Sequence, residues 1–314
     1  MCESHSRHIC AIIWTFNPDI KQFTKVLESV CNQVDQVIVV DNRSDNIFEV
    51  QSTCTAFNKV VLIKIGFNSG VHALNVGMKY AVETFKPSFI LLLDDDTIIY
   101  PNAILTVLSK VLEKNNLCKA IGIIQITSQH VPLNWRGKCI MFWSRGIFSG
   151  SLIRVELIKR GLKVREEFFL DQADYDFYNQ IRRLGFITVM YGEKLMDHKI
   201  GMKVMLPSLR RPYKRRIWIY EPPWRYYYVV RNSTVLLMEG GLDIKSYVEQ
   251  LIAYMVPLFF MDGILGTLKV LVLGIVHGLL RKLGILDLKN IGFLPNTHTN
   301  RLNRRALLNM VYNL

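Results

Sequence analysis

The sequence lacks the features that would predict export from the cell. Its six cysteines, at positions 2, 10, 31, 54, 118 and 139, form no CxxC pair and no spacing typical of a zinc site, so we expect reduced, mostly packed thiols. Residues 1–7 contain no apolar core of the signal-peptide type. These absences predict a cytoplasmic protein.

The sequence also has no long apolar run that is free of charge and proline. Its most apolar tract, from Leu251 to Leu280, is interrupted by Pro257, Asp262, Lys269 and His277, whereas a membrane-spanning helix needs about 20 predominantly apolar residues. We therefore expect two amphipathic or buried helices here, partly docked on a membrane surface.

Acidic residues are scarce relative to basic ones. The 26 Asp and Glu face 39 Lys and Arg, which gives a net charge of +13 over 314 residues and implies an anionic partner. The densest basic run, 210–216, adjoins Tyr- and Trp-rich segments at 217–220 and 224–228. Because Tyr and Trp favour membrane interfaces, this combination predicts contact with anionic lipid headgroups or a lipid diphosphate.

The sequence does contain a regular alternation of short apolar runs and helical stretches. The apolar runs are Ile9–Trp14, Val37–Val40, Val60–Ile65, Phe89–Leu93 and Ala120–Ile126. The order of strand and then helix, repeated, predicts an α/β fold with a mainly parallel sheet. In such a sheet, ligands bind beyond the carboxyl ends of the strands.

The fourth apolar run leads directly into three adjacent carboxylates, Asp94, Asp95 and Asp96. Carboxylates at a strand end suit Mg²⁺ or Mn²⁺, which bind through one or two of them and complete their shell with water and substrate phosphates. Alternation along the strand places Asp94 and Asp96 on one face and Asp95 on the other. The alternative is a solvated acidic turn before a helix that starts near Pro101.

Polar, turn-forming residues follow the other predicted strands as well. These segments are 15–19 (TFNPD), 41–44 (DNRS) and 66–70 (GFNSG). Each alone is ordinary turn or N-cap chemistry, but several at one rim indicate a nucleotide site. Asp41 would accept the imide N–H of a uracil or thymine base, and Asn68 and Gly70 would approach the ribose or diphosphate.

In order along the chain, these motifs resemble those of glycosyltransferase family 2, and in particular its bacterial rhamnosyltransferase-like branch. The resemblance continues through Asn75-x-Gly77, 148–153 (FSGSLI), 168–176 (FFLDQADYD), 197–201 (DHKIG) and 225–232 (RYYYVVRN), and covers residues 8–285. It implies a GT-A type nucleotide-diphospho-sugar transferase domain over residues 1–235. Residues 236–314 would form a helical, membrane-associating region.

The resemblance also implies roles for individual residues. Asp94, Asp96 and His198 would hold a divalent cation, Mn²⁺ or Mg²⁺, and Asp174 would be the catalytic base. Many relatives have Glu-Asp at the position of Ala173-Asp174, and this chain has Asp171 and Asp176 nearby. The residues expected to bind the donor are Thr15, Asn17, Asp41, Asn68, Gly70, Asn75, Asp94, Asp95 and Arg231. Those expected on the acceptor side are Ser149, Gly150, Asp171 and Asp176.

We therefore predict an inverting, metal-dependent glycosyltransferase on the inner face of the cytoplasmic membrane. By resemblance alone, the sugar is L-rhamnose from dTDP-rhamnose, and the acceptor is a polyprenyl-linked or polysaccharide glycan of the cell surface. The alternatives are a galactofuranosyl or hexosyl transferase that uses a UDP-sugar, and a non-catalytic nucleotide-sugar-binding protein, which would not need Asp174. Nucleic-acid binding would explain the charge but not the acidic triplet.

Overall fold

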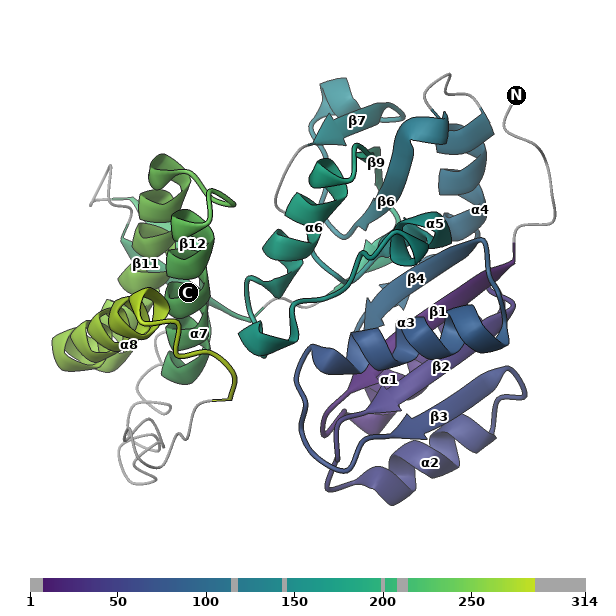
Figure 1. The fold of residues 1–314 in the computed structure, drawn as a ribbon, viewed down its shortest axis with the longest axis horizontal. Helices are drawn as coiled ribbons and strands as arrows, with labels where there is room; N and C mark the ends of the chain where they lie inside the picture. Colours follow the sequence, from purple (N-terminus) through teal and green to yellow (C-terminus); the bar gives the residue numbers. More distant parts are fainter. Residues whose placement is uncertain (1–7, 114–117, 143–145, 199–200, 208–213, 286–314) are drawn as a thin grey trace.

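The computed structural model describes residues 8–113, 118–142, 146–198, 201–207 and 214–285. A central sheet with helices on both faces forms the larger part, and a helical region with a two-stranded hairpin lies beside it (Figure 1). The first elements are β1 (Ile9–Thr15), α1 (Ile20–Cys31), β2 (Gln36–Asp41), α2 (Ile47–Thr55), β3 (Val60–Lys64), α3 (His72–Thr84), β4 (Phe89–Asp94), β5 (Ile98–Ile99), α4 (Ala103–Val107) with a π-helical continuation (Leu108–Glu113), and β6 (Ile121–Thr127). They are followed by β7 (Cys139–Phe142), β8 (Ser151–Arg154), α5 (Val155–Lys159), α6 (Ala173–Arg183), β9 (Ile187–Lys194), β10 (Met196–Asp197), β11 (Met202–Pro207), β12 (Arg215–Tyr220), α7 (Pro223–Met238) and α8 (Ile244–Leu279).

The main sheet has eight strands in the order β3-β2-β1-β4-β8-β6-β9-β7. The strands β3, β2, β1 and β4 are parallel, as are β6 and β9. Strand β8 runs antiparallel between β4 and β6, and β7 runs antiparallel to β9. All the predicted strands are present, and the predicted α/β fold with a mainly parallel sheet is confirmed.

Both faces of the sheet are buried, which explains the uninterrupted apolar runs. Along β1, Ile9, Ala11 and Ile13 pack in the layer that includes α1, α2 and α4. Cys10 and Ile12 pack in the opposite layer, with α3, α5 and α6. Because β1, β2 and β4 are parallel, their carboxyl ends lie at one edge of the sheet, where the polar residues that follow them gather.

Four cysteines have described side chains, and none of the four forms a disulfide. Cys10, Cys31 and Cys54 are buried, whereas Cys139 is exposed. Burial raises the pKa of Cys10 to about 12. The three buried thiols are therefore packing residues, as expected.

The helices α7 and α8 pack together beside the sheet, with the β11–β12 hairpin against α8 (Figure 1). Tyr226, Tyr227 and Tyr228 of α7 are buried with Leu258 and Val270 of α8. Residue 235, the expected domain boundary, falls inside α7, so the division into 1–235 and 236–314 stays a prediction.

The apolar tract forms one helical stretch that is broken at Gly263, where φ is 77° and ψ is 177°. The helix α8 is long and apolar enough to cross a membrane by length and composition alone. Only 11% of its most apolar window is buried within the protein. The expectation of two helical segments agrees with the break at Gly263. Of the two expected alternatives, amphipathic or buried, the structure favours amphipathic helices, because Leu258 and Val270 pack against α7 whereas Phe260, Ile264 and Leu265 are exposed.

Candidate active site

The ends of β1 and β2 place Thr15 and Asp41 together. Asp41 is 1% exposed, and its carboxylate accepts hydrogen bonds from the Thr15 hydroxyl at 2.9 Å and from the Ser44 amide at 2.9 Å. Next to them, the Asn17 side chain accepts a hydrogen bond from the Asp45 amide at 2.6 Å. Thr15, Asn17 and Asp41, all predicted to bind the donor, therefore lie together at the carboxyl ends of β1 and β2. The Asp41 carboxylate is already hydrogen-bonded within the fold.

The loop before α3 contains the predicted donor residues Asn68 and Gly70, and α3 contains Asn75. Gly70 has a φ of 57°, and a Cβ there would lie 2.0 Å from the Phe169 carbonyl oxygen. The Asn75 side chain donates to the Val164 carbonyl and accepts from the Val164 amide, both at 2.8 Å. Gly70 and Asn75 thus hold the segment 164–169 against α3. The Asn68 side chain accepts from the Gly70 amide at 3.0 Å and supports the same turn.

The acidic triplet begins on the last residue of β4. The Asp94 carboxylate accepts a hydrogen bond from the indole N–H of Trp14 at 2.6 Å. On its other oxygen it contacts His198 Nε2 at 3.0 Å, and the same nitrogen lies 3.6 Å from Asp96 Oδ1. The backbone amide of Asp94 donates to the Ser149 hydroxyl at 3.0 Å. Asp94 is therefore fixed from three sides.

The three carboxylates have different electrostatic environments. Burial alone would raise the pKa of Asp94, but hydrogen bonds from His198 and Trp14 lower it below its usual value. Burial would lower the pKa of His198, but Asp94 and Asp96 raise it. For Asp95, burial and the charges of its two neighbours raise the pKa to about 7. Asp94 and Asp95 therefore differ in charge state near neutral pH, and the strand β4 ends at Asp94, so the predicted alternation of Asp94, Asp95 and Asp96 stays a prediction.

Asp94, Asp96 and His198 have the composition of a divalent metal site. Each offers one ligand atom, and the three atoms lie within 4.8 Å of one another. Two carboxylate oxygens and one imidazole nitrogen suit Mn²⁺ and, less well, Mg²⁺. The His198 imidazole reaches them from the chain just after β10, which pairs with β5 next to the triplet. The residues present therefore fit a bound divalent cation.

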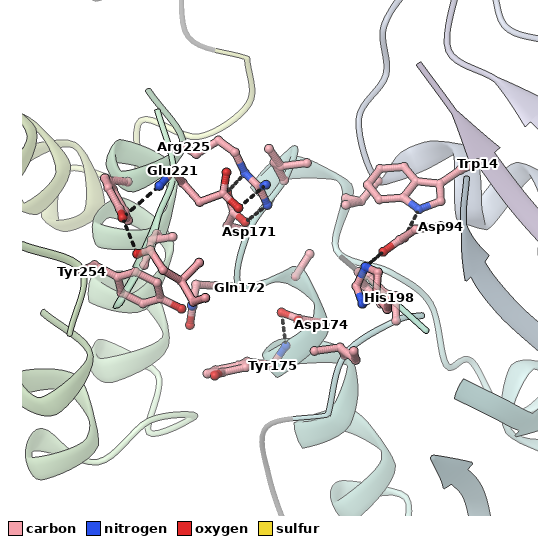
Figure 2. Close-up of a pocket in the computed structure, with 18 residues that line it drawn as sticks. Trp14, Asp94, Asp171, Gln172, Asp174, Tyr175, His198, Glu221, Arg225 and Tyr254 are labelled. Carbon is pink, nitrogen blue, oxygen red and sulfur yellow. Dashed lines mark hydrogen bonds and ion pairs between the residues drawn. The ribbon is translucent and has the colours of Figure 1, made fainter. Parts of the chain in front are cut away.

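Asp94 and His198 of this candidate site line a cavity of about 240 Å³ between the sheet edge and the helices α7 and α8. Figure 2 shows Trp14, Asp94 and His198 on one side of it and Asp174 between them and the helices. Asp174 lies in the first turn of α6 and accepts a hydrogen bond from the Tyr175 amide at 2.9 Å. Burial, together with the charge of Asp171, raises the pKa of Asp174 to about 7, which suits a general base at neutral pH.

A cluster of ion pairs forms the opposite wall of the cavity. The Arg225 guanidinium donates to both oxygens of Asp171, at 2.6 and 3.2 Å, and contacts Glu221 at 3.1 Å. Trp14, Glu221 and Arg225 also line the cavity, and the sequence alone does not predict a role for them. In the sequence, Trp14 stands at the end of an apolar run and Arg225 stands in a segment that resembles a family motif. Neither position predicts that Trp14 contacts Asp94 or that Arg225 contacts Asp171.

Arg231, which is predicted to bind the donor, is not among the residues that line the cavity. Its side chain is 1% exposed, and it donates to the Phe168 carbonyl at 3.0 Å and the Gly284 carbonyl at 2.7 Å. Its neighbour Asn232 donates to the Asp171 carbonyl at 2.7 Å. Both residues therefore hold the loop 168–172, which precedes the predicted base.

The predicted acceptor residues separate into two groups. Asp171 lines the cavity. Asp176 does not: its carboxylate accepts from Gln180 at 2.7 Å on the buried side of α6. Ser149 and Gly150 lie behind β4, where the Ser149 hydroxyl supports Asp94 and the Gly150 amide donates to the Leu92 carbonyl at 2.8 Å.

The sheet, its strand-end carboxylates and the adjoining cavity define a GT-A type transferase of nucleotide sugars. The sequence model for glycosyl transferase family 2 matches residues 10–173, and the chain belongs to this family. It is 25% identical over 262 residues to dTDP-rhamnosyl transferase RfbF of Shigella flexneri, which is 78% of this chain and 85% of that protein.

Among solved structures, the crystal structure of S. aureus TarS 1–349 matches with a TM-score of 0.54 and 15% identity, covering 86% of this chain and 80% of that one. At this identity the likeness concerns the fold. The protein is therefore a glycosyltransferase of GT-A fold, and its family implies a nucleotide-sugar donor and a glycan acceptor.

Proposed function

We propose that the protein is an inverting, metal-dependent rhamnosyltransferase that uses dTDP-L-rhamnose. The observation that supports it most is the cavity lined by Asp94, His198 and Asp174, with Asp96 next to the first two. The choice of rhamnose and dTDP rests on the similarity to a dTDP-rhamnosyl transferase. The proposed acceptor is a polyprenyl-linked or polysaccharide glycan of the cell surface.

In the proposed reaction, Asp174 takes the proton of an acceptor hydroxyl while the oxygen of that hydroxyl forms a bond to C1 of the sugar. The bond from C1 to the diphosphate breaks on the opposite face, so the configuration at C1 inverts and dTDP leaves. A bound cation would supply charge stabilisation to the leaving diphosphate. Trp14 orients Asp94 for this task through its indole hydrogen bond, and His198 would bind the cation together with Asp94 and Asp96.

The donor would bind across the ends of β1, β2 and β4, with its base near Asp41 and its diphosphate near the cluster. Thr15, Asn17, Asn68 and Asp95 surround this path in the proposal. The acceptor would approach from the side of Asp171 and the helices α7 and α8, because Asp174 lies between these helices and the metal cluster (Figure 2).

We also propose that the protein is cytoplasmic and attaches to the inner face of the membrane through α8 and the β11–β12 hairpin. The exposed apolar side chains of α8 include Phe260 (49% exposed), Ile264 (59%) and Leu265 (79%). Exposed basic residues of the adjoining hairpin segment are Lys203, Lys214, Arg215 and Arg216. Residues 208–213, which contain the rest of the predicted basic run, lie outside the described residues.

An apolar helix face next to a cationic hairpin suits an anionic bilayer, because lasting attachment needs both a burial contribution and a charge contribution. A second copy of the chain would cover the apolar face but would not use the basic residues. Detergent-free size exclusion followed by sedimentation with anionic vesicles separates these two outcomes.

The test of the proposed activity is release of nucleoside diphosphate from a panel of donors. Purified protein is incubated with dTDP-L-rhamnose, UDP-galactofuranose and UDP-hexoses, each with Mn²⁺, with Mg²⁺ or with EDTA. We expect dTDP release from dTDP-L-rhamnose that requires the cation, and NMR of the product should show an inverted anomeric centre. If only UDP is released, the donor is a UDP-sugar and not dTDP-L-rhamnose. If the release rate in EDTA equals the rate with Mn²⁺ or Mg²⁺, the metal mechanism is refuted. In the same assay, Asp96→Asn should lose the cation-dependent release, whereas the control Glu28→Gln, which changes an exposed acid on α1, should keep it.

A further inference from the structure

Gln172 is a buried polar residue that the reaction described above does not use. It lines the cavity next to Asp174 and is 4% exposed. Among the described residues, its Oε1 atom is buried and has no hydrogen-bond partner. Buried amide oxygens in folded proteins are nearly always hydrogen-bonded, so an unpartnered one on a residue that lines a cavity points to a ligand group.

The backbone of Gln172 is in a conformation that disfavours glutamine. Its φ is 71° and its ψ is −5°, a left-handed conformation in which Gly and Asn are favoured over longer side chains. Two residues of α7 hold the loop 168–172 in this conformation. Arg225 donates to the Asp171 carboxylate, and Asn232 donates to the Asp171 carbonyl. The local fold alone would favour glycine at this position, so the glutamine side chain calls for a separate explanation.

The position of Gln172 assigns the kind of ligand. In Figure 2, Asp94 and His198 lie on one side of the cavity, which we call the metal side, and Gln172 points toward Tyr254 of α8 on the other side. Asp174 lies between the two sides. A donor sugar that is held through its diphosphate lies on the metal side. The group whose proton Asp174 takes must then lie on the side of Gln172 and Tyr254.

We propose that Gln172 and Tyr254 form the subsite for the acceptor sugar, in which the Gln172 amide hydrogen-bonds a ring hydroxyl and so selects the acceptor. An amide both donates and accepts, which matches a sugar hydroxyl. The Tyr254 ring, which packs against Tyr226 at a centroid distance of 5.6 Å, offers an apolar face to the sugar ring. This subsite rests on the proposed glycosyl transfer and deepens it.

The test measures sugar binding and stability separately. Saturation-transfer NMR follows methyl glycosides of L-rhamnose, D-glucose, D-galactose and N-acetyl-D-glucosamine added to full-length protein that is saturated with dTDP and Mg²⁺. The variants are Gln172→Gly and Gln172→Asn, which suit the left-handed backbone better than glutamine and remove or shorten the amide. The control is Gln51→Asn, an exposed glutamine on α2. Thermal unfolding and dTDP titration accompany each variant.

We expect the wild type and Gln51→Asn to bind at least one glycoside, and both Gln172 variants to bind it about tenfold more weakly, the usual effect of one lost hydrogen bond in a buried site. Their melting temperatures should equal or exceed that of the wild type, and their dTDP affinity should stay close to it. Unchanged glycoside affinity in Gln172→Gly would overturn the subsite, and so would a wild type that binds dTDP but none of the glycosides. A wild type that binds neither dTDP nor UDP would instead refute the proposed donor site, and the subsite with it.

Discussion

Replacement of Asp174 by Asn tests the proposed base because it should change activity and stability in opposite directions. The Asn oxygen can still accept from the Tyr175 amide, as Asp174 does at 2.9 Å, so the loop should keep its shape. The side chain can no longer take a proton from the acceptor. We expect turnover to fall by roughly 10²- to 10⁴-fold, the usual contribution of general base catalysis, while affinity for dTDP stays near that of the wild type.

The stability effect follows from the pKa of Asp174. Burial raises it from 3.8 to about 7, so the folded protein binds more protons than the unfolded chain between these two values. The stability contribution of this group therefore falls as the pH rises through this interval and is constant above it. A shift of about 3 units at about 1.4 kcal/mol each gives a cost of at most about 4 kcal/mol. Asp174→Asn removes this cost and should be about 1 to 4 kcal/mol more stable than wild type near pH 8.

Urea unfolding of wild type and Asp174→Asn, repeated from about pH 4 to pH 8, measures this difference. The gap in unfolding free energy should be small at the acid end and grow toward pH 7, while wild-type turnover should rise over the same range. The matched control is Asp171→Asn, which removes the charge and one of the two oxygens that accept from Arg225 at 2.6 and 3.2 Å and should lose about 1 to 3 kcal/mol. The reasoning fails if Asp174→Asn is less stable than wild type at pH 8, or if Asp171→Asn alone abolishes turnover.

Three further outcomes follow from the structure. Asp96→Ala should abolish cation-dependent transfer and weaken Mn²⁺ binding in calorimetry while the melting temperature changes little; full activity would exclude Asp96 as a ligand. Gly70→Ala should lose about 2 kcal/mol or more of unfolding free energy, because its Cβ would lie 2.0 Å from the Phe169 carbonyl oxygen at a φ of 57°; a normal urea midpoint would contradict this packing role. The double change Ile264→Asp and Leu265→Asp should reduce sedimentation with anionic vesicles without loss of dTDP release, and unchanged sedimentation would remove α8 from the proposed membrane surface.

The sequence by itself determined the sheet and one side of the site. Strands that are buried on both faces need unbroken apolar runs, and the turns after them favour Asn, Asp and Gly. The runs that end at Trp14, Val40 and Leu93 therefore located three strands, and the polar residues after them located one edge of the site. The acidic triplet at the end of the fourth run likewise predicted a candidate cation site, and the structure places His198 beside Asp94 and Asp96. These signals are local in the chain, and local signals can be read without a structure.

Only the tertiary structure decided which distant side chains meet. The register of β1 with β4 sets Trp14 beside Asp94, and the packing of α7 sets Arg225 on Asp171. The same packing takes Arg231 out of the cavity, because its guanidinium is needed by carbonyls of the loop 168–172 and of the segment after α8. A polar residue can bind a ligand only if the fold does not already use it to hydrogen-bond buried backbone groups. Which backbone groups need such a partner depends on how segments far apart in sequence pack together.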